Sequence, residues 1–321
     1  MNKPTTVLFD EIYQNTLKNA VLLQHPNPAI LRLKGPGAMD LLNRMSTNDM
    51  LASGTDEVLK TVFTNTNARI IDIASVIPGD EEFFLISWRD SASILLDWLS
   101  GYIFFQDDVH LRESTNDWTM FDFIGPNAEH GLKETAPFED YPGHGFYRVE
   151  NGYIWLDPLG KLPRYRLLCQ GDLALELVTH GCGPSQPILN DALYDVLRIE
   201  AGIPQMGSEI KHDSIPLEVG LRDTISFSKG CYIGQEIIAR MQSRGKLAHT
   251  LVGVQLDEQV KPGSDLIQNN HKIGVITSCT YSPRFGWVGL ASLKPASLET
   301  PAQITRTNQE TNIQIHSLPF E

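Results

Sequence analysis

Two places in the first half of the chain show the same order of a strand, a Gly-Pro turn and a short helix. Strand-like alternation over 29–33 runs into Gly35-Pro36-Gly37, and apolar residues at helical spacing follow. The same order returns where the apolar segment 120–124 leads into Gly125-Pro126-Asn127-Ala128 and a second helical pattern. Proline suits a first helical position because its fixed φ matches the helix. The repeat predicts two related split αβ halves, and the alternative is a pair of unrelated Gly-Pro turns.

Further strand and helix patterns surround these two units. Short apolar runs bounded by turn residues predict strands, and apolar stripes that end at a glycine predict helices. The expected strands cover 58–63, 70–77, 83–88 and 164–169, and the expected helices lie between 90 and 101 and between 172 and 181.

The character of the chain changes near Leu247. From there the pattern is one of short strands punctuated by Pro262-Gly263, Asn269-Asn270 and Ser282-Pro283, without a helical period. Such a region predicts a small all-β barrel or sandwich. We therefore expect residues 1–245 to hold two αβ units and residues 246–321 to form a C-terminal β-barrel.

Charge and cysteine content limit the function. The net charge of −13 disfavours sequence-independent binding of nucleic acid over a broad surface. A binding site for an anionic ligand would have to supply local positive side chains. The four cysteines, Cys169, Cys182, Cys231 and Cys279, lack the spacing of a disulfide framework or a zinc site. With no targeting pattern or long apolar run, we expect a protein of the cytoplasm and no metal site.

One carboxylate falls on a predicted buried face. In the helical pattern 190–202 the apolar stripe is Leu193, Val196 and Leu197, and Glu200 takes its next position. Burying an unpaired carboxylate costs several kcal/mol. Glu200 therefore needs donors, which are either protein groups or the adjacent N–H groups of a planar heterocycle.

A polar, glycine-containing loop precedes a predicted helix at 235–245. Cys231 stands in this loop beside Lys229, where helix N–H groups and the lysine charge would favour the thiolate. The alternative is a cysteine that acts only as a small buried hydrophobe. Glu236 suits the first turn as a cap, and Arg240, one turn before Arg244, suits either a ligand carboxylate or the helix C-terminus.

The octapeptide Lys229-Gly230-Cys231-Tyr232-Ile233-Gly234-Gln235-Glu236 resembles the K-G-C-[YF]-x-G-Q-E signature of the YgfZ family, which an arginine, here Arg240, follows. Upstream, the segment 198–204 resembles the R-x-E-x-G-x-P element that this family shares with the aminomethyltransferase T-protein of glycine cleavage. The resemblance is strong over 193–245 and general elsewhere.

The resemblance implies an α+β fold in which two interwoven ferredoxin-like αβ units form a folate-binding cavity and a small C-terminal β-barrel follows. It also implies tetrahydrofolate or a one-carbon derivative as the cofactor, and a role in the assembly or repair of iron-sulfur enzymes, including those that methylthiolate tRNA. By this analogy Glu200 holds the pterin and Cys231 is the required thiol. The analogy assigns the rest of the cofactor site to Lys229, Gly230, Tyr232, Gln235, Glu236 and Arg240.

Two other functions are consistent with the sequence. In the aminomethyltransferases an aspartate on an N-terminal strand assists one-carbon transfer, and Asp72 lies in a similar place, although an outward polar position on an alternating strand is the favoured interpretation. A folate-dependent aminomethyl transferase is thus the first alternative. The second is a non-catalytic interaction scaffold. The sequence does not require independent turnover, and direct nucleic-acid binding and membrane association are not expected.

Overall fold

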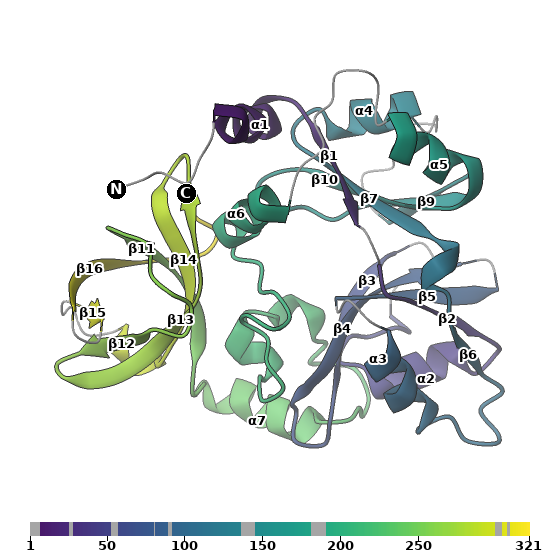
Figure 1. The fold of residues 1–321 in the computed structure, drawn as a ribbon. Helices are drawn as coiled ribbons and strands as arrows, with labels where there is room; N and C mark the ends of the chain where they lie inside the picture. The colour runs from purple at the N-terminus through teal and green to yellow at the C-terminus, as the bar shows by residue number, and fades with distance from the viewer. Residues whose placement is uncertain are drawn as a thin grey trace.

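The computed structural model describes residues 7–25, 28–52, 57–79, 81–88, 92–135, 145–180, 191–298, 304–306 and 309–321. Figure 1 shows three parts arranged in a ring, two αβ units and one barrel. The fold class predicted from the sequence, two interwoven αβ units followed by a β-barrel, is confirmed.

The first αβ unit is built on a five-stranded sheet with the order β1-β7-β10-β9-β8. These strands are β1 (Val21–His25), β7 (Thr119–Ile124), β10 (Arg164–Cys169), β9 (Gly152–Leu156) and β8 (Phe146–Val149). Its helices are α1 (Val7–Lys18), α4 (Ala128–Thr135) and α5 (Gly171–His180), and the 3₁₀ turn η1 (Thr115–Asp117) leads into β7. All neighbouring strands in this sheet run antiparallel.

The second αβ unit is inserted between β1 and β7 of the first. Its sheet has the order β3-β4-β5-β2-β6. The strands are β3 (Leu59–Thr64), β4 (Ile70–Pro78), β5 (Glu82–Ser87), β2 (Ile30–Lys34) and β6 (His110–Glu113), with α2 (Ala38–Met45) and α3 (Ser93–Ser100). Because the chain enters the first sheet, builds the second and then returns, the two units are interwoven.

The predicted repeat is present at β2–α2 and β7–α4. Gly35 and Gly125 have φ of 118° and 132°, a backbone conformation that L side chains rarely adopt. A Cβ at Gly35 would lie 2.2 Å from the carbonyl oxygen of Asp108, and one at Gly125 would lie 2.3 Å from that of Asn19. Glycine is therefore required twice for the same reason, the close approach of a neighbouring backbone.

The C-terminal strands close into a barrel with the order β11-β14-β13-β12-β15-β16. They are β11 (Thr250–Leu256), β14 (Gly286–Leu293), β13 (His271–Ser282), β12 (Asp265–Gln268), β15 (Ile304–Arg306) and β16 (Gln309–His316), with η4 (Pro295–Ser297) after β14. Before the barrel come α6 (Asp191–Ala201), η2 (Pro216–Val219), η3 (Arg222–Thr224) and α7 (Gln235–Arg244). Ile199 of α6 packs on Val288, Leu290 and Phe320, which fixes the barrel against the first unit.

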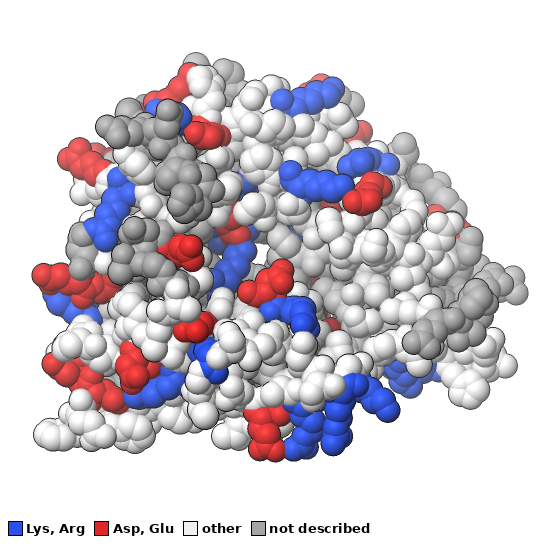
Figure 2. All heavy atoms as spheres, turned by 180° about the vertical axis from the view of Figure 1, so that it is seen from behind, with Lys and Arg blue, Asp and Glu red and all other residues white. Residues whose placement is uncertain are grey.

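The surface carries mixed charge. Figure 2 shows acidic and basic side chains interspersed on one face, which is hollowed near its centre with basic atoms visible inside the hollow. Within the part of the chain that the structure describes, no helix is long and apolar enough to cross a membrane.

Candidate functional site: a cationic central cavity

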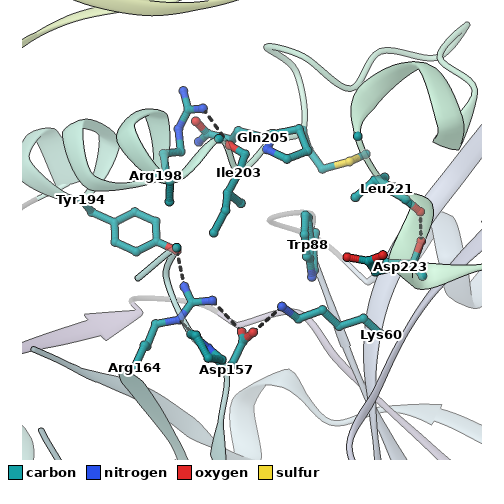
Figure 3. A pocket seen from close by; sticks show the side chains of 18 of the residues that line it. Lys60, Trp88, Asp157, Arg164, Tyr194, Arg198, Ile203, Gln205, Leu221 and Asp223 are labelled. Carbon is teal, nitrogen blue, oxygen red and sulfur yellow. Dashed lines mark hydrogen bonds and ion pairs between the residues drawn. The ribbon is translucent and has the colours of Figure 1, made fainter. Parts of the chain in front are cut away.

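A cavity of about 850 Å³ lies where the three parts of the ring meet (Figure 3). Both sheets contribute to its wall, as do the end of α6, the segment that follows it and the C-terminal tail. The polar wall is formed by His25, Lys60, Ser87, Asp157, Arg164, Arg166, Tyr194, Arg198, Gln205, Asp223 and Thr224. Trp88, Met120, Ile203, Met206 and Leu221 supply much of the apolar wall. This mixture of apolar surface and a few converging polar groups is typical of a small-molecule site, for which the usual volume is about 300–1,000 Å³.

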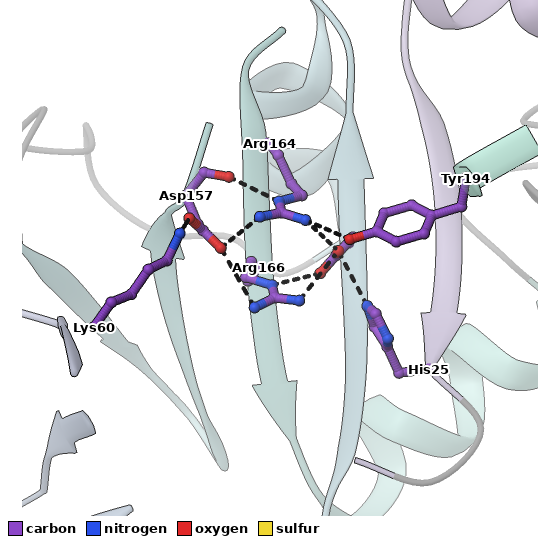
Figure 4. A network of polar contacts seen from close by, with 7 residues as sticks. His25, Lys60, Asp157, Arg164, Arg166 and Tyr194 are labelled. Carbon is purple, nitrogen blue, oxygen red and sulfur yellow. Dashed lines mark hydrogen bonds and ion pairs between the residues drawn. The ribbon is translucent and has the colours of Figure 1, made fainter. Parts of the chain in front are cut away.

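A network of buried charges spans one wall of the cavity (Figure 4). Its first centre is Asp157, just beyond β9. Arg164 Nη2 donates to Asp157 Oδ2 at 2.6 Å, and Arg164 Nε donates to the Asp157 carbonyl at 2.7 Å. Lys60 of β3 donates to Asp157 Oδ1, which links the two αβ units across the cavity wall.

The second centre of the network is Asp122 in the middle of β7. Arg166 Nε donates to Asp122 Oδ1 at 2.9 Å, and His25 Nε2 lies 3.0 Å from Asp122 Oδ2. Arg166 Nη1 also lies 3.3 Å from Asp157 Oδ2, so Arg166 joins the two centres. Tyr194 of α6 completes the network by accepting a hydrogen bond of 2.8 Å from Arg164 Nη1.

These contacts determine the charge states of the network. Burial opposes ionisation of Asp157, but the charges of Arg164, Lys60 and Arg166 outweigh it and lower its pKa to about 2. Burial also opposes ionisation of Asp122, and Arg166, His25 and Arg164 together hold its pKa well below the usual range. The pKa of Lys60 is lowered, chiefly because it is buried and lies near the two arginines, although Asp157 acts in the opposite direction.

Arg198 forms a separate buried cluster at the edge of the cavity. Its guanidinium donates to Glu209 Oε2 at 3.1 Å and to Ser278 Oγ at 3.0 Å, and it pairs with Asp195 at 2.6 Å. Ser278 lies on β13 and donates in turn to Glu209 Oε1 at 2.5 Å. The arginine of the predicted R-x-E-x-G-x-P element therefore holds the barrel to α6, with its charge compensated by protein carboxylates.

Glu200 points away from the cavity wall. Tyr13 of α1 donates its hydroxyl to both carboxylate oxygens, at 2.9 and 3.1 Å, and Phe320 donates its N–H to the Glu200 carbonyl at 2.8 Å. Burial raises the pKa of Glu200, while hydrogen bonds from Ser282 and Tyr13 act against this. The donors that the sequence required are thus protein groups. Glu200 is absent from the described cavity lining, because its helix position faces α1 and the barrel.

Lys229 of the signature loop points inward, away from Cys231. Its Nζ donates to the carbonyls of Asn43, Ser46 and Asn48 at 2.5, 2.7 and 2.5 Å, and it lies 5.1 Å from the centre of the Tyr232 ring. Burial lowers the pKa of Lys229 to about 8. The Lys229 ammonium, which the sequence placed in the loop beside Cys231, thus donates to carbonyls at and just after the C-terminal end of α2.

The other signature residues lie at the protein surface or in a small core beside it. Gly230 and Cys231 are exposed, and Tyr232 is buried against Ala68 of the neighbouring hairpin. Gln235 is half-buried, and Glu236 and Arg240 form an exposed i,i+4 ion pair at 2.5 Å. None of these residues belongs to the described lining of the cavity. The loop predicted as a cofactor site is thus separate from the cavity, and Cys182 lies outside the described residues.

Asp72 is buried, which corrects the favoured interpretation of an outward polar residue on β4. Ser87 of β5 donates to Asp72 Oδ2 at 2.6 Å, and the N–H of Ile73 donates to Oδ1 at 2.7 Å. Ser87 lines the cavity, whereas Asp72 does not. The outward prediction failed because both faces of β4 are covered. Asp72 lies opposite Phe63, on the face where Ala74 and Val76 pack with α2 and α3, and Ile73 packs with Val219 and Leu221 on the other face.

The charged wall of the cavity was not predicted from the sequence. A local signal was present, because Arg164 and Arg166 alternate inside an apolar strand and Asp122 interrupts another. Two-residue spacing places the arginines on one face of β10, and a buried charge requires partners. Their partners could not be read locally, since Asp122 and Lys60 come from strands far away in the sequence.

Comparisons with known proteins agree with this architecture. Residues 11–155 match the family model for the GCVT N-terminal domain, and residues 249–320 match that for the glycine cleavage T-protein C-terminal barrel domain. The crystal structure of the glycine cleavage system aminomethyltransferase T from Bartonella henselae superposes with a TM-score of 0.85, covering 98% of this chain and 89% of that chain at 18% identity. The two proteins therefore share a fold.

Relatives in sequence are similar over most of the chain. A putative chloroplastic transferase of Arabidopsis thaliana is 26% identical over 270 residues, which are 78% of this chain and 59% of that protein. An aminomethyltransferase of Aquifex aeolicus is 28% identical, with 75% of this chain and 67% of the relative covered. An aminomethyltransferase of Thermoanaerobacter sp. is 25% identical, with 90% and 83% covered.

Fold and cavity define a protein of the aminomethyltransferase-like class, with two interwoven αβ units and a barrel around a central site. The chain contains a GCVT N-terminal domain and a glycine cleavage T-protein C-terminal barrel domain, which together match more than half of its residues and relate it to the T-protein.

Proposed function

We propose that the protein binds tetrahydrofolate or a one-carbon derivative in its central cavity. The observation that carries the proposal is a cavity of about 850 Å³ that gathers Lys60, Arg164 and Arg166 on one wall of a protein whose net charge is −13. A folate is an anion with a flat ring system, and it needs such local positive charge together with an apolar wall. Several relatives are named aminomethyltransferases, which is consistent with folate as the ligand class.

Anaerobic calorimetry with tetrahydrofolate tests this proposal. We expect low micromolar binding or tighter to the native protein. Ala201→Trp, at the cavity end of α6, should abolish binding by filling the cavity, whereas Ala239→Trp on the exposed face of α7 should leave it unchanged. No binding to the native protein, or equal binding to both variants, would contradict a folate site in this cavity.

Glu200 provides a second test of the same site. The family resemblance predicts that it holds the pterin, but its carboxylate is engaged by Tyr13 and faces away from the cavity. Glu200→Gln retains an oxygen that accepts from Tyr13 and should therefore leave the fold intact. Weakened tetrahydrofolate binding would mean that the carboxylate turns toward the ligand, and unchanged binding would remove Glu200 from the site.

The second part of the proposal is an accessory role in the assembly or repair of iron-sulfur enzymes in the cytoplasm, including those that methylthiolate tRNA. The YgfZ-type signature supports it, as does the exposure of Cys231 on a loop that Lys229 anchors. Cys231→Ser should abolish rescue of client activity in cells that lack the protein and should leave folate affinity unchanged. Cys279→Ser in the barrel is the matched control. Full rescue of client activity by Cys231→Ser would contradict the accessory role of this thiol.

A one-carbon transferase is the second candidate, and the Asp72–Ser87 contact at the cavity wall favours it. Asp72 would reach a bound folate only through the Ser87 hydroxyl, which already donates to it at 2.6 Å. Protein, tetrahydrofolate and an aminomethylated carrier should then yield methylenetetrahydrofolate, and Asp72→Asn should slow the reaction. A flat time course with a native protein that binds folate would remove the transferase and leave the accessory role.

A further inference from the structure

The network around Asp122 and Asp157 holds more positive than negative groups, and the one further carboxylate in the described cavity lining, Asp223, is exposed to water. Lys60, Arg164 and Arg166 are three basic side chains, whereas Asp122 and Asp157 are two carboxylates, which leaves an excess of one positive charge. Arg164, Arg166 and both carboxylates are at most 9% exposed, so water compensates this excess poorly. A buried excess charge is costly unless a counter-ion joins it.

The basic side chains of this network differ in the number of protein acceptors to which they donate. Arg164 has three hydrogen-bond acceptors, the Asp157 carbonyl, the Asp157 carboxylate and the Tyr194 hydroxyl, and its Nη1 lies 3.5 Å from Asp122 Oδ2. Lys60 donates to Asp157, and the described residues provide no second acceptor for its ammonium, which has three N–H groups. Its side chain is 33% exposed, the most open of the three cations, and its Nζ lies 5.9 Å from the centre of the Trp88 ring in the cavity wall.

Tyr194 supplies a second donor on the same wall. Because its hydroxyl accepts from Arg164 Nη1, its own proton is directed to another acceptor. Figure 3 shows Lys60 and Tyr194 on either side of the Arg164–Asp157 pair, both at the edge of the cavity. Two donors and one uncompensated positive charge thus face the same space.

We propose that this wall, formed by Lys60, Arg166 and Tyr194 around Asp157, is a subsite for a carboxylate group. A carboxylate carries one negative charge and so balances the excess of one, whereas a phosphate dianion would overcompensate it. Its two oxygens can accept from Lys60 and from the Tyr194 hydroxyl at the same time. The inference rests on the proposed function, since the carboxylate belongs either to the glutamate tail of the folate or to a separate small amino acid that enters beside it.

Calorimetry with three probes separates these sources and tests the subsite. The probes are tetrahydrofolate, 6-methyltetrahydropterin, which has the reduced ring system but no carboxylate, and glycine added to protein saturated with 6-methyltetrahydropterin. The variants are Lys60→Met, Lys60→Arg, which keeps the charge, and Lys272→Met, which removes an ion-paired lysine from the barrel surface. Lys60→Met leaves Asp157 paired with both arginines, so the fold should persist, and its thermal unfolding is measured alongside.

If the subsite takes the glutamate tail, Lys60→Met weakens tetrahydrofolate binding about 10- to 100-fold and leaves the binding of 6-methyltetrahydropterin unchanged. If it takes a separate amino acid, glycine binds the loaded native protein and Lys60→Met removes that binding alone. Lys60→Arg should restore either signal, and Lys272→Met should not change it.

Two results would overturn the subsite. One is equal weakening of tetrahydrofolate and 6-methyltetrahydropterin by Lys60→Met without glycine binding, and the other is no effect of Lys60→Met on any probe. Both leave folate binding by the native protein, and hence the proposed function, standing. If the native protein binds neither pterin ligand, the proposed function fails. Glycine added to the unliganded protein then decides the subsite, and the absence of Lys60-dependent binding would overturn it.

Discussion

Lys229→Met should destabilise the protein although Lys229 lies on the surface loop that carries the family signature. The Lys229 ammonium is the donor to three backbone carbonyls, those of Asn43, Ser46 and Asn48, and the residue is 8% exposed. Methionine preserves the apolar stem and removes the donor. The loop and the end of α2 then lose the contact that joins them across 186 positions of sequence.

The expected magnitude follows from two opposing terms. Leaving a buried acceptor without its donor costs about 1–3 kcal/mol per group, and three carbonyls are affected here. Removing a partly buried charge returns about 1–2 kcal/mol, after allowing for solvent screening. The free energy of unfolding should therefore fall by about 3 kcal/mol at pH 7.

The stability difference between the native protein and Lys229→Met should depend on pH. The pKa of Lys229 is lowered from 10.5 to about 8 in the native protein. Between these values the unfolded chain holds a proton that the native protein has released, so rising pH favours the native state. The stability difference between native protein and Lys229→Met should grow, by about 1 kcal/mol between pH 7 and 9.5 after allowing for screening.

Urea unfolding followed by tryptophan fluorescence at the two pH values measures both quantities. Lys272→Met is the control, because an exposed ion-paired lysine contributes about 0–1 kcal/mol. A loss of less than about 0.5 kcal/mol on Lys229→Met would refute the assignment of Lys229 as a structural anchor. A difference that shrinks as pH rises would contradict the lowered pKa of its ammonium.

Three further predictions concern other parts of the molecule. Asp157 has a native pKa of about 2 against 3.8 for the ordinary side chain, so about 2 kcal/mol of stability should be lost as pH falls from 4 to 2. Asp157→Asn should flatten that part of the acid unfolding curve, and an unchanged curve would contradict the pairing. Gly125→Ala should cost about 2–4 kcal/mol in chemical unfolding because its Cβ would meet the Asn19 carbonyl at 2.3 Å, whereas Gly230→Ala, with no atom within 4 Å, should be tolerated. Iodoacetamide at pH 7.5 should label exposed Cys231 well before buried Cys169, whose pKa burial raises to about 12, and peptide mass mapping that finds equal labelling would contradict these placements.

Local sequence patterns predicted the architecture well. The two Gly-Pro turns, the strands between them and the strand-only C-terminal region correspond to β2–α2, β7–α4 and the barrel. These features depend on interactions between neighbours in sequence, or on a glycine that tolerates close backbone approach, and both leave a local signature.

The site was less accessible to the same reasoning. Helical spacing correctly placed Glu200 on an inward face. It could not distinguish a ligand cavity from the interface with α1, where the Tyr13 hydroxyl donates a hydrogen bond to the Glu200 carboxylate. Lys229 was expected beside Cys231 because the two are near in sequence. In the fold the four-carbon side chain of Lys229 places its ammonium beside the carbonyl of Ser46, which is far away in the sequence.

The sequence by itself determined the fold class, the family resemblance and the requirement that a binding site for an anionic ligand supply its own positive groups. The division of the chain near residue 246 remains a prediction. Only the tertiary structure decided where those groups are. Lys60, Asp122, Asp157 and Arg166 come from four separate segments, and they form one network because the two interwoven sheets both contribute to the wall of the same cavity. A charge network depends on distances in space, and one chain's sequence records only distances along the backbone.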